Sequence, residues 1–214
     1  MIILGEESAF APNLFIPTNS SPTPPGPTPS IPTTLGSRID NKATVVGVLQ
    51  DNEGNDYVLA VVDAAYRSNL PMSWGQINVN TPLVDDEYGE MIDHHTGKYN
   101  TDLILSTYNA TDYPAFNFAR NACTVTIGSN TYYSVLPSLT ELNLIYENKD
   151  SLDQYDTTAS SYPYRRLDYR FSYWASTEGD DELAWGFNPY GTCGHDKNTD
   201  YANDVCPVIC IPLS

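Results

Sequence analysis

Apolar residues form two short, nearly continuous runs, "ATVVGVLQ" at 43–50 and "DYVLAVVD" at 56–63. Both runs are rich in β-branched residues, which favour strands. The residues between them, "DNEGN", are typical of a tight turn. The pattern therefore predicts a β-hairpin that opens a sheet.

The segment 136–152, "LPSLTELNLIYENKDSL", has helical periodicity. Ser138 and Glu141 have the S-x-x-E spacing of a capping box, in which each side chain accepts a backbone N–H at the start of a helix. The apolar side chains that follow fall on one helical face and are Leu139, Leu142, Ile145 and Tyr146. We expect a helix here.

A second, short helix is predicted at 112–123, "DYPAFNFARNAC", with Asp112 as its cap and Pro114 in its first turn. Three apolar segments joined by turns rich in Asp, Asn, Gly and Ser read as strands, at 171–177, 182–187 and 204–211. The expected fold class is α+β, a mixed domain with two helices and antiparallel strands.

The N-terminal part differs in composition from the rest. Half of the sixteen prolines fall between Pro12 and Pro32, and so many prolines exclude helix and sheet. We therefore divide the chain into an anchoring peptide (1–17), a Pro-rich spacer (18–36) and a globular domain (37–214). At about 3.1 Å per residue, the core of the spacer could span roughly 40 Å.

The anchoring peptide is apolar and contains no basic residue. A frayed apolar tail is one interpretation, and a peptide that docks into a groove of a partner is the other, because soluble proteins rarely leave such residues unburied. In the second interpretation, the partner-anchoring residues are Ile2, Ile3, Leu4, Phe10, Leu14, Phe15 and Ile16.

Acidic residues outnumber basic ones by 27 to 10, which gives a net charge of −17. Such a chain repels nucleic acid and anionic lipid, so we expect neither as a partner. No apolar run reaches the roughly 20 residues of a membrane span. The first basic residue is Arg38, so the N-terminus lacks the basic region of a secretory signal, and we expect synthesis in the cytoplasm.

Four cysteines occur, and none belongs to a C-x-x-C motif. Cys206 and Cys210 would lie about 13 Å apart on one strand, too far to bridge each other. We expect free buried thiols, with a cross-link from Cys193 to another strand as the alternative.

The histidines do not form a familiar metal motif. His94 and His95 are adjacent and would point to opposite faces of a strand, and His195 is distant in sequence. The segment "DKNTD" at 196–200 resembles the first half of a calcium loop, but Tyr201 and Pro207 stand where an EF-hand needs Gly and Glu. We expect no cofactor, and a looser calcium site formed by Asp196, Asp200 and Asp204 stays open.

Five motifs carry a resemblance to a known family. In chain order they are "GKYNTDLI" (97–104), "LPSLTELNLIYENKD" (136–150), "YWASTE" (173–178), "LAW" (183–185) and "VCPV" (205–208). This order resembles a C-type-lectin-like family that includes the C-terminal domain of a collagen-like bacterial adhesin. Its fold is shared with the formylglycine-generating enzyme and with the phage major tropism determinant. Two positions depart from the family pattern, Ser134 and Cys206.

The resemblance implies a C-type-lectin-like fold in which Trp174 and Trp185 pack in one hydrophobic layer on neighbouring antiparallel strands. It places the acidic turn "EGDDE" at 178–182 and the segment 188–204 at the ligand-facing end, where loops vary with function. The ligand-binding residues expected there are Asp180, Asp181, Tyr190, His195, Asp196, Asn198, Asp200 and Tyr201.

The resemblance also implies a function: a non-enzymatic phage surface protein, either a head fibre or a capsid decoration protein, located on the virion surface. Its partners would be a capsid or other virion protein, bound through the N-terminus, and a host-surface glycan or protein. A homo-oligomer such as a trimer is expected, as is common for such appendages.

Several alternatives stay open. They are a tail receptor-binding protein, a bacterial surface adhesin, a capsid cement without a host ligand, and an enzyme of the formylglycine-generating or carbohydrate-active kind. The last would need reactive cysteines, or two carboxyl groups facing each other across a sugar.

Overall fold

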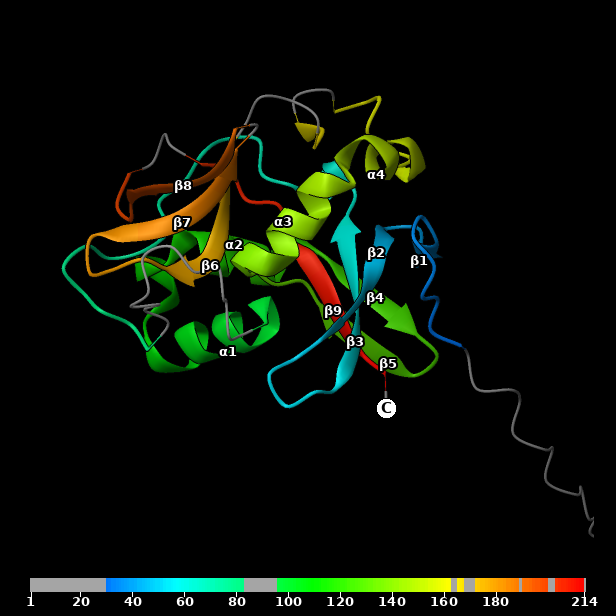
Figure 1. Ribbon diagram of the computed structural model, residues 1–214, viewed down its shortest axis with the longest axis horizontal. Helices are drawn as coiled ribbons and strands as arrows, with labels where there is room; N and C mark the ends of the chain where they lie inside the picture. Colours follow the sequence, from blue (N-terminus) through cyan, green and yellow to red (C-terminus); the bar gives the residue numbers. More distant parts are fainter. Residues whose placement is uncertain are drawn as a thin grey trace, which may run out of the picture.

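The computed structural model describes residues 30–82, 96–162, 165–167, 172–188, 190–199 and 203–213. These residues form a mixed α+β domain with antiparallel sheets, which confirms the predicted fold class (Figure 1). The expected anchoring peptide and most of the spacer lie outside the described residues. Ile31 already packs against the core, next to a cluster that contains Ile39 and Val45.

The first sheet has four strands in the order β1-β2-β3-β9. Its strands are β1 (Arg38–Ile39), β2 (Ala43–Gln50), β3 (Asp56–Val62) and β9 (Val208–Pro212). The predicted hairpin is β2–β3, and its turn is held by the Asp51 side chain, which accepts the backbone N–H groups of Glu53 and Asn55 at 2.9 Å. The C-terminal strand pairs antiparallel with β3, so the two ends of the domain meet in one sheet.

The second sheet has three strands in the order β6-β7-β8. They are β6 (Tyr173–Glu178), β7 (Leu183–Asn188) and β8 (Gly191–Asp196). The first two were predicted. The third lies in a segment that we interpreted as a loop, and its sequence "GTCGHD" lacks the apolar, β-branched signal of a strand. Pairing along the whole length of β7 makes it a strand.

The two tryptophans of this sheet do not share a layer, contrary to expectation. Trp174 pairs with Gly186. The residue before Gly186 in β7, Trp185, therefore projects from the opposite face of the sheet. Trp174 is completely buried, and its indole N–H donates to the Met72 carbonyl at 2.7 Å. Trp185 is partly buried against a different cluster, which contains Phe187. Interior packing is confirmed for Trp174, whereas the shared layer was wrong.

The described residues contain four α-helices, more than the two expected. They are α1 (Gly97–Thr107), α2 (Pro114–Ala122), α3 (Leu139–Glu147) and α4 (Lys149–Tyr155). The predicted capping box of Ser138 and Glu141 is present at the start of α3. The predicted helix 136–152 is divided at Asn148, which ends α3 and precedes α4.

Helix α2 begins differently from the prediction. Its N-cap is Tyr113, without a side-chain cap bond, and Asp112 belongs to a short 3-10 turn, η2 (Ala110–Asp112). Pro114 occupies the first turn as expected. A second 3-10 turn, η1 (Ala64–Tyr66), follows β3, and a small hairpin of β4 (Thr124–Ile127) and β5 (Asn130–Tyr133) follows α2.

Helix α3 lies between the two sheets (Figure 1). Its buried side chains Leu139, Leu142 and Ile145 pack in a core cluster with residues of β3, β6 and β9. A second cluster contains Trp74, Tyr113, Phe116 and Trp174, and covers the other face of β6. The helix thus packs against strands of both sheets.

Glu141 connects the elements around α3. Its carboxylate accepts the backbone N–H groups of Ser138 at 2.8 Å and Gly97 at 3.1 Å, and the Tyr57 hydroxyl at 2.8 Å. The Cys210 thiol lies 3.5 Å from the same carboxylate. One fully buried side chain therefore joins α1, α3, β3 and β9.

A substitution of Gly97, the first residue of α1, tests whether the contacts of Glu141 stabilise the fold. A Cβ at this position would lie 2.3 Å from the Leu136 carbonyl oxygen and 2.6 Å from the Glu141 carboxylate. We expect Gly97→Ala to lower the free energy of unfolding by about 2–4 kcal/mol, because α1 must move and Glu141 loses a donor. Urea denaturation measures this loss. Gly194→Ala is the control, since its Cβ would meet only the Trp185 ring at 3.8 Å; equal losses in both variants would contradict the interpretation.

Candidate functional site

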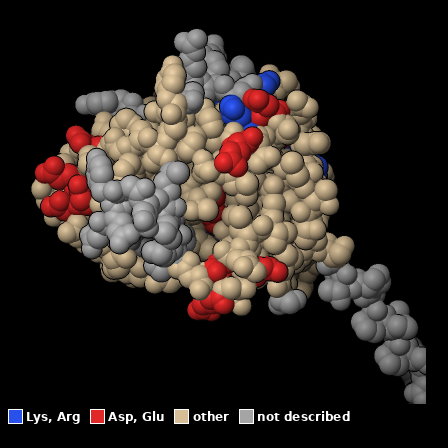
Figure 2. All heavy atoms as spheres, in the orientation of Figure 1, with Lys and Arg blue, Asp and Glu red and all other residues tan. Residues whose placement is uncertain are grey.

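Four of the expected ligand-binding residues gather at one end of the β6-β7-β8 sheet. Asp180 and Asp181 lie in the β6–β7 turn, Asp196 ends β8, and Asn198 follows it. Leu183 pairs with Asp196, so the turn and the end of β8 are adjacent. All four side chains are exposed. We call these residues the acidic end; Figure 2 shows acidic side chains grouped at the left edge, over the β6–β7 turn.

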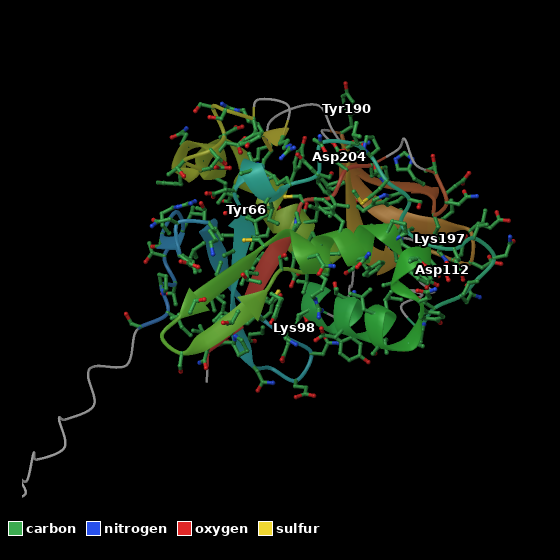
Figure 3. All side chains as sticks on the ribbon, turned by 180° about the vertical axis from the view of Figure 1, so that it is seen from behind. Tyr66, Lys98, Asp112, Tyr190, Lys197 and Asp204 are labelled. Atoms are coloured by element: carbon green, nitrogen blue, oxygen red, sulfur yellow. The ribbon has the colours of Figure 1, made fainter. Side chains whose placement is uncertain are left out.

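A buried ion pair supports the acidic end from below. Lys197 (labelled in Figure 3) and Glu178 are both completely buried, and their charged groups are in direct contact. The Lys197 ammonium also donates to the Val79 carbonyl at 2.9 Å and lies 5.4 Å from the centre of the Trp74 ring. Burial raises the pKa of Glu178, and the hydrogen bonds from Lys197 and Thr81 act in the opposite direction.

This pair fixes the loop that runs beside the acidic end. The backbone N–H of Thr81 donates to the Glu178 carboxylate at 2.9 Å. The backbone N–H of Trp74 donates to the Lys197 carbonyl, and that of Asn78 to the Asp181 carbonyl, both at 2.8 Å. The loop 74–81 is therefore bonded to β6, to the β6–β7 turn and to the residue after β8. The exposed side chains of the acidic end therefore project from backbone that these hydrogen bonds and the buried ion pair hold in place; we call this supporting structure the frame.

The other expected ligand-binding residues lie elsewhere. Tyr190 is 97% exposed in the β7–β8 turn, at the opposite end of that hairpin, and points away from the domain (Figure 3). His195 lies against Trp174, with 6.0 Å between ring centres, and its buried Nε2 has no hydrogen-bond partner among the residues that the structure describes. Asp200 and Tyr201 lie outside the described residues. The expected ligand-facing set is therefore not a single cluster.

The looser calcium site of Asp196, Asp200 and Asp204 is not tested as a whole, because Asp200 lies outside the described residues. Asp204 is buried, and its carboxylate is 3.3 Å from the Ser68 hydroxyl group, which donates to it. Within the described ranges, no three or more His, Cys, Asp or Glu side chains are placed to hold a metal ion. His94 and His95 lie outside these ranges.

All four cysteines are free thiols; Cys123, Cys206 and Cys210 are buried as predicted, whereas Cys193, for which a cross-link was the alternative, is only partly buried. Burial raises the pKa of Cys123 to about 11 and that of Cys206 to about 12, and it raises that of Cys210 well above its usual value. These thiols are therefore protonated at neutral pH and are poor nucleophiles.

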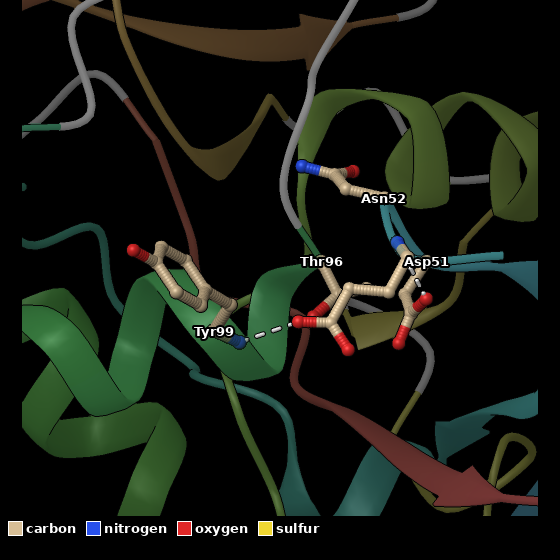
Figure 4. Close-up of a pocket in the computed structure, with 5 residues that line it drawn as sticks. Asp51, Asn52, Thr96 and Tyr99 are labelled. Carbon is tan, nitrogen blue, oxygen red and sulfur yellow. Dashed lines mark hydrogen bonds between the residues drawn. The ribbon is translucent and has the colours of Figure 1, made fainter. Parts of the chain in front are cut away.

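A groove that the sequence did not predict lies between the β2–β3 turn and the start of α1 (Figure 4). Its volume is about 180 Å³, and it is lined by Asp51, Asn52, Glu53, Thr96 and Tyr99. Thr96 caps α1 by accepting the Tyr99 N–H at 3.1 Å, and the Tyr99 side chain is half exposed. An aromatic ring beside carboxylate and amide groups suits a ligand with several hydroxyl groups.

Asn203 is a further polar group that sequence reasoning missed. It is completely buried, and neither atom of its side-chain amide has a hydrogen-bond partner among the described residues. It occupies the space above Gly186, where a Cβ would come within 3.0 Å of the amide nitrogen. The glycine is therefore required for this close approach to β7.

Comparison with known proteins found no matching protein family, no significantly similar curated sequence and no similar solved structure. None of the helices in the described ranges is long and apolar enough to cross a membrane.

The Lys197–Glu178 pair predicts a large effect of a single substitution. Lys197→Met keeps an unbranched side chain that is one atom shorter, but it leaves the Glu178 carboxylate buried without its cation. We expect a loss of about 3–5 kcal/mol in the free energy of unfolding. The double variant Lys197→Met/Glu178→Gln should recover part of it, because no charge is then buried. Lys42→Met, which removes the exposed pair with Asp40, is the control and should cost at most about 1 kcal/mol. Urea denaturation of all three variants measures these losses. If Lys197→Met were as stable as Lys42→Met, the structural role of the buried pair would be contradicted.

Asp204 predicts a pH dependence. Burial raises its pKa from 3.8 to about 6, against opposing contributions from Ser68 and Arg165. The folded state therefore binds the proton more tightly, so this group stabilises the fold at low pH and loses that contribution as pH rises from about 4 to 6. The stability of Asp204→Asn relative to the natural protein should increase over this window by on the order of 2–3 kcal/mol. Denaturation at a series of pH values measures it, and a constant difference between the two proteins would refute the assignment.

Proposed function

We propose that the chain is a non-enzymatic binding protein displayed on a surface, and that its domain binds a host-surface glycan or protein. The observation that carries this proposal is the acidic end, where exposed side chains stand on a frame held by a buried ion pair and backbone hydrogen bonds. A rigid polar surface loses little conformational entropy on binding. Loops on such a scaffold are common sites of recognition.

The chemistry of the interior supports binding over catalysis. The buried thiols are protonated, and the buried Lys197 and Glu178 are paired with each other. Arg67, the other buried basic residue in the described part of the chain, contacts Asp153 and Asp156, both at 3.2 Å. These groups hold the fold together, so they are not available for general acid–base or nucleophilic chemistry.

For the setting, we propose a phage particle, with the chain acting as a head fibre or decoration protein. The support is the resemblance of the five sequence motifs and the order of an apolar peptide, a Pro-rich spacer and a globular domain. The N-terminal peptide then holds a capsid or other virion protein, and the spacer keeps the binding domain away from that surface. A homo-oligomer such as a trimer would multiply weak contacts through avidity.

Ligand binding through the acidic end is tested with the full chain on a glycan array and on intact bacterial cells. The variant Asp181→Asn/Asp196→Asn should weaken the observed binding by about tenfold and leave the stability nearly unchanged, because both side chains are exposed. Glu147→Gln/Asp150→Asn removes the same charge from α3 and α4 and should bind normally. Equal binding by both variants would rule out the acidic end as the ligand site.

Anchoring is tested separately by deleting residues 2–29. The deletion keeps Ile31 and the β1 strand, so the domain should unfold at the same urea concentration and bind cells as before. Its association with phage particles should be lost. A truncated protein that still copurifies with particles would place the anchor in the domain instead.

A further inference from the structure

A second cavity, of about 170 Å³, lies where α1, α2, β5 and β9 meet. It is lined by Lys98, Asp102, Arg120, Thr131, Tyr132, Tyr133, Val135 and Cys210. All of these residues are described, and the cavity is distinct from the acidic end. Its volume is below the roughly 300 Å³ at which pockets begin to hold drug-sized ligands, so it suits a single small ring.

The cavity carries a local positive charge in a strongly acidic protein. The Lys98 ammonium lies 2.6 Å from one oxygen of Asp102, and the Arg120 guanidinium contacts the other oxygen. Burial alone would raise the pKa of Asp102, but the hydrogen bonds from Lys98 and Arg120 outweigh it and lower the pKa. The carboxylate is therefore ionised at neutral pH, and two cations facing one anion leave one net positive charge.

The two cations have donors to spare. An ammonium has three N–H groups and a guanidinium has five, and among the described residues Lys98 donates to one oxygen of Asp102. The Arg120 Nε is buried and has no hydrogen-bond partner among the described residues. Charge-assisted hydrogen bonds to a second carboxylate can satisfy these donors.

The rest of the cavity wall is neutral. Tyr133 is 59% exposed and offers an aromatic face, and Thr131 offers a hydroxyl group. The Cys210 thiol has a pKa far above neutral and adds no charge. Glu141 lies behind this thiol, where it already accepts hydrogen bonds from Ser138, Gly97 and Tyr57.

We propose that this cavity binds the carboxylate-bearing ring of an acidic sugar, such as a uronic acid. Lys98 and Arg120 bind the carboxylate, Tyr133 packs against the ring, and Thr131 bonds a ring hydroxyl. An aromatic wall distinguishes this ligand from a small inorganic anion, which would use only the cations. The inference rests on the proposed function: it adds to the acidic end a second binding site in the same domain, and it names the class of glycan bound at that second site.

Binding is measured with the full chain by calorimetry and by NMR chemical-shift changes. The probes are glucuronate, its neutral counterpart glucose, and inorganic phosphate. Glucuronate should bind and shift resonances of Lys98, Arg120 and Tyr133, and glucose should not bind detectably. Phosphate that binds as tightly as glucuronate, or glucuronate that does not bind at all, would overturn the proposal.

Variants test the individual contacts. Lys98→Gln and Arg120→Gln should each weaken glucuronate binding by about tenfold or more, because each removes a charge-assisted hydrogen bond. Tyr133→Ala should also weaken it. Lys149→Gln removes the same charge from α4 and is the matched control. Unchanged binding in both Lys98→Gln and Arg120→Gln would exclude this cavity.

Asp102→Asn provides a test with the opposite sign. It removes the anion that competes for Lys98 and Arg120, so glucuronate should bind about fivefold more tightly. If Lys98, Asp102 and Arg120 had only a structural role, the substitution would not increase the affinity for glucuronate. An equal or weaker affinity would count against the proposal. Cell binding is measured with the same protein preparations: if cells bind and glucuronate does not, the proposed function survives and only the acidic-sugar site fails.

Discussion

The domain depends on one buried carboxylate. Glu141 caps its own helix α3, holds the first N–H of α1, and accepts the Tyr57 hydroxyl from β3. Each of these hydrogen bonds pairs a buried donor with the buried carboxylate, and leaving buried polar groups unpaired would destabilise the fold. The close approach of α1 requires Gly97, since any side chain there would meet the Leu136 carbonyl. The positions of α1 and α3, and the cavities around them, follow from this contact.

The strongest local signals in the sequence predicted the fold well. The β2–β3 hairpin, the capping box of α3 and the strands β6, β7 and β9 have clear periodicity or turn chemistry. Helix α1 was missed although Thr96 is a local N-cap; the other contact at its start is with Glu141, which lies 44 residues further along the chain from Gly97. Strand β8 was missed because its sequence carries no strand signal and its pairing with β7 decides its conformation.

The candidate site was only partly predictable, for a similar reason. Asp181 and Asp196 were expected to lie together, and the pairing of β7 with β8 brings them to one end. The same pairing moves Tyr190 to the other end, which sequence distance alone could not indicate. The frame below was not predicted either, because Lys197 and Glu178 resemble ordinary surface charges in the sequence and are fully buried only in the fold. Basic residues are few in this chain, and Lys98 and Arg120 both contact the carboxylate of Asp102, so two of them lie close together.

The last described segment, 203–213, has a consequence for synthesis of the protein. Asp204 bridges to Tyr173 at the start of β6, Val208 bridges to Val135, and β9 then completes the first sheet beside β3. Both sheets and the segment before α3 therefore need residues that leave the ribosome after all the other described elements. A growing chain can form the β2–β3 hairpin early, but its main core closes only after residues 203–213 have been synthesised. Until then, the apolar edge of β3 is exposed to other chains, and a chaperone that shields strand edges would favour correct folding.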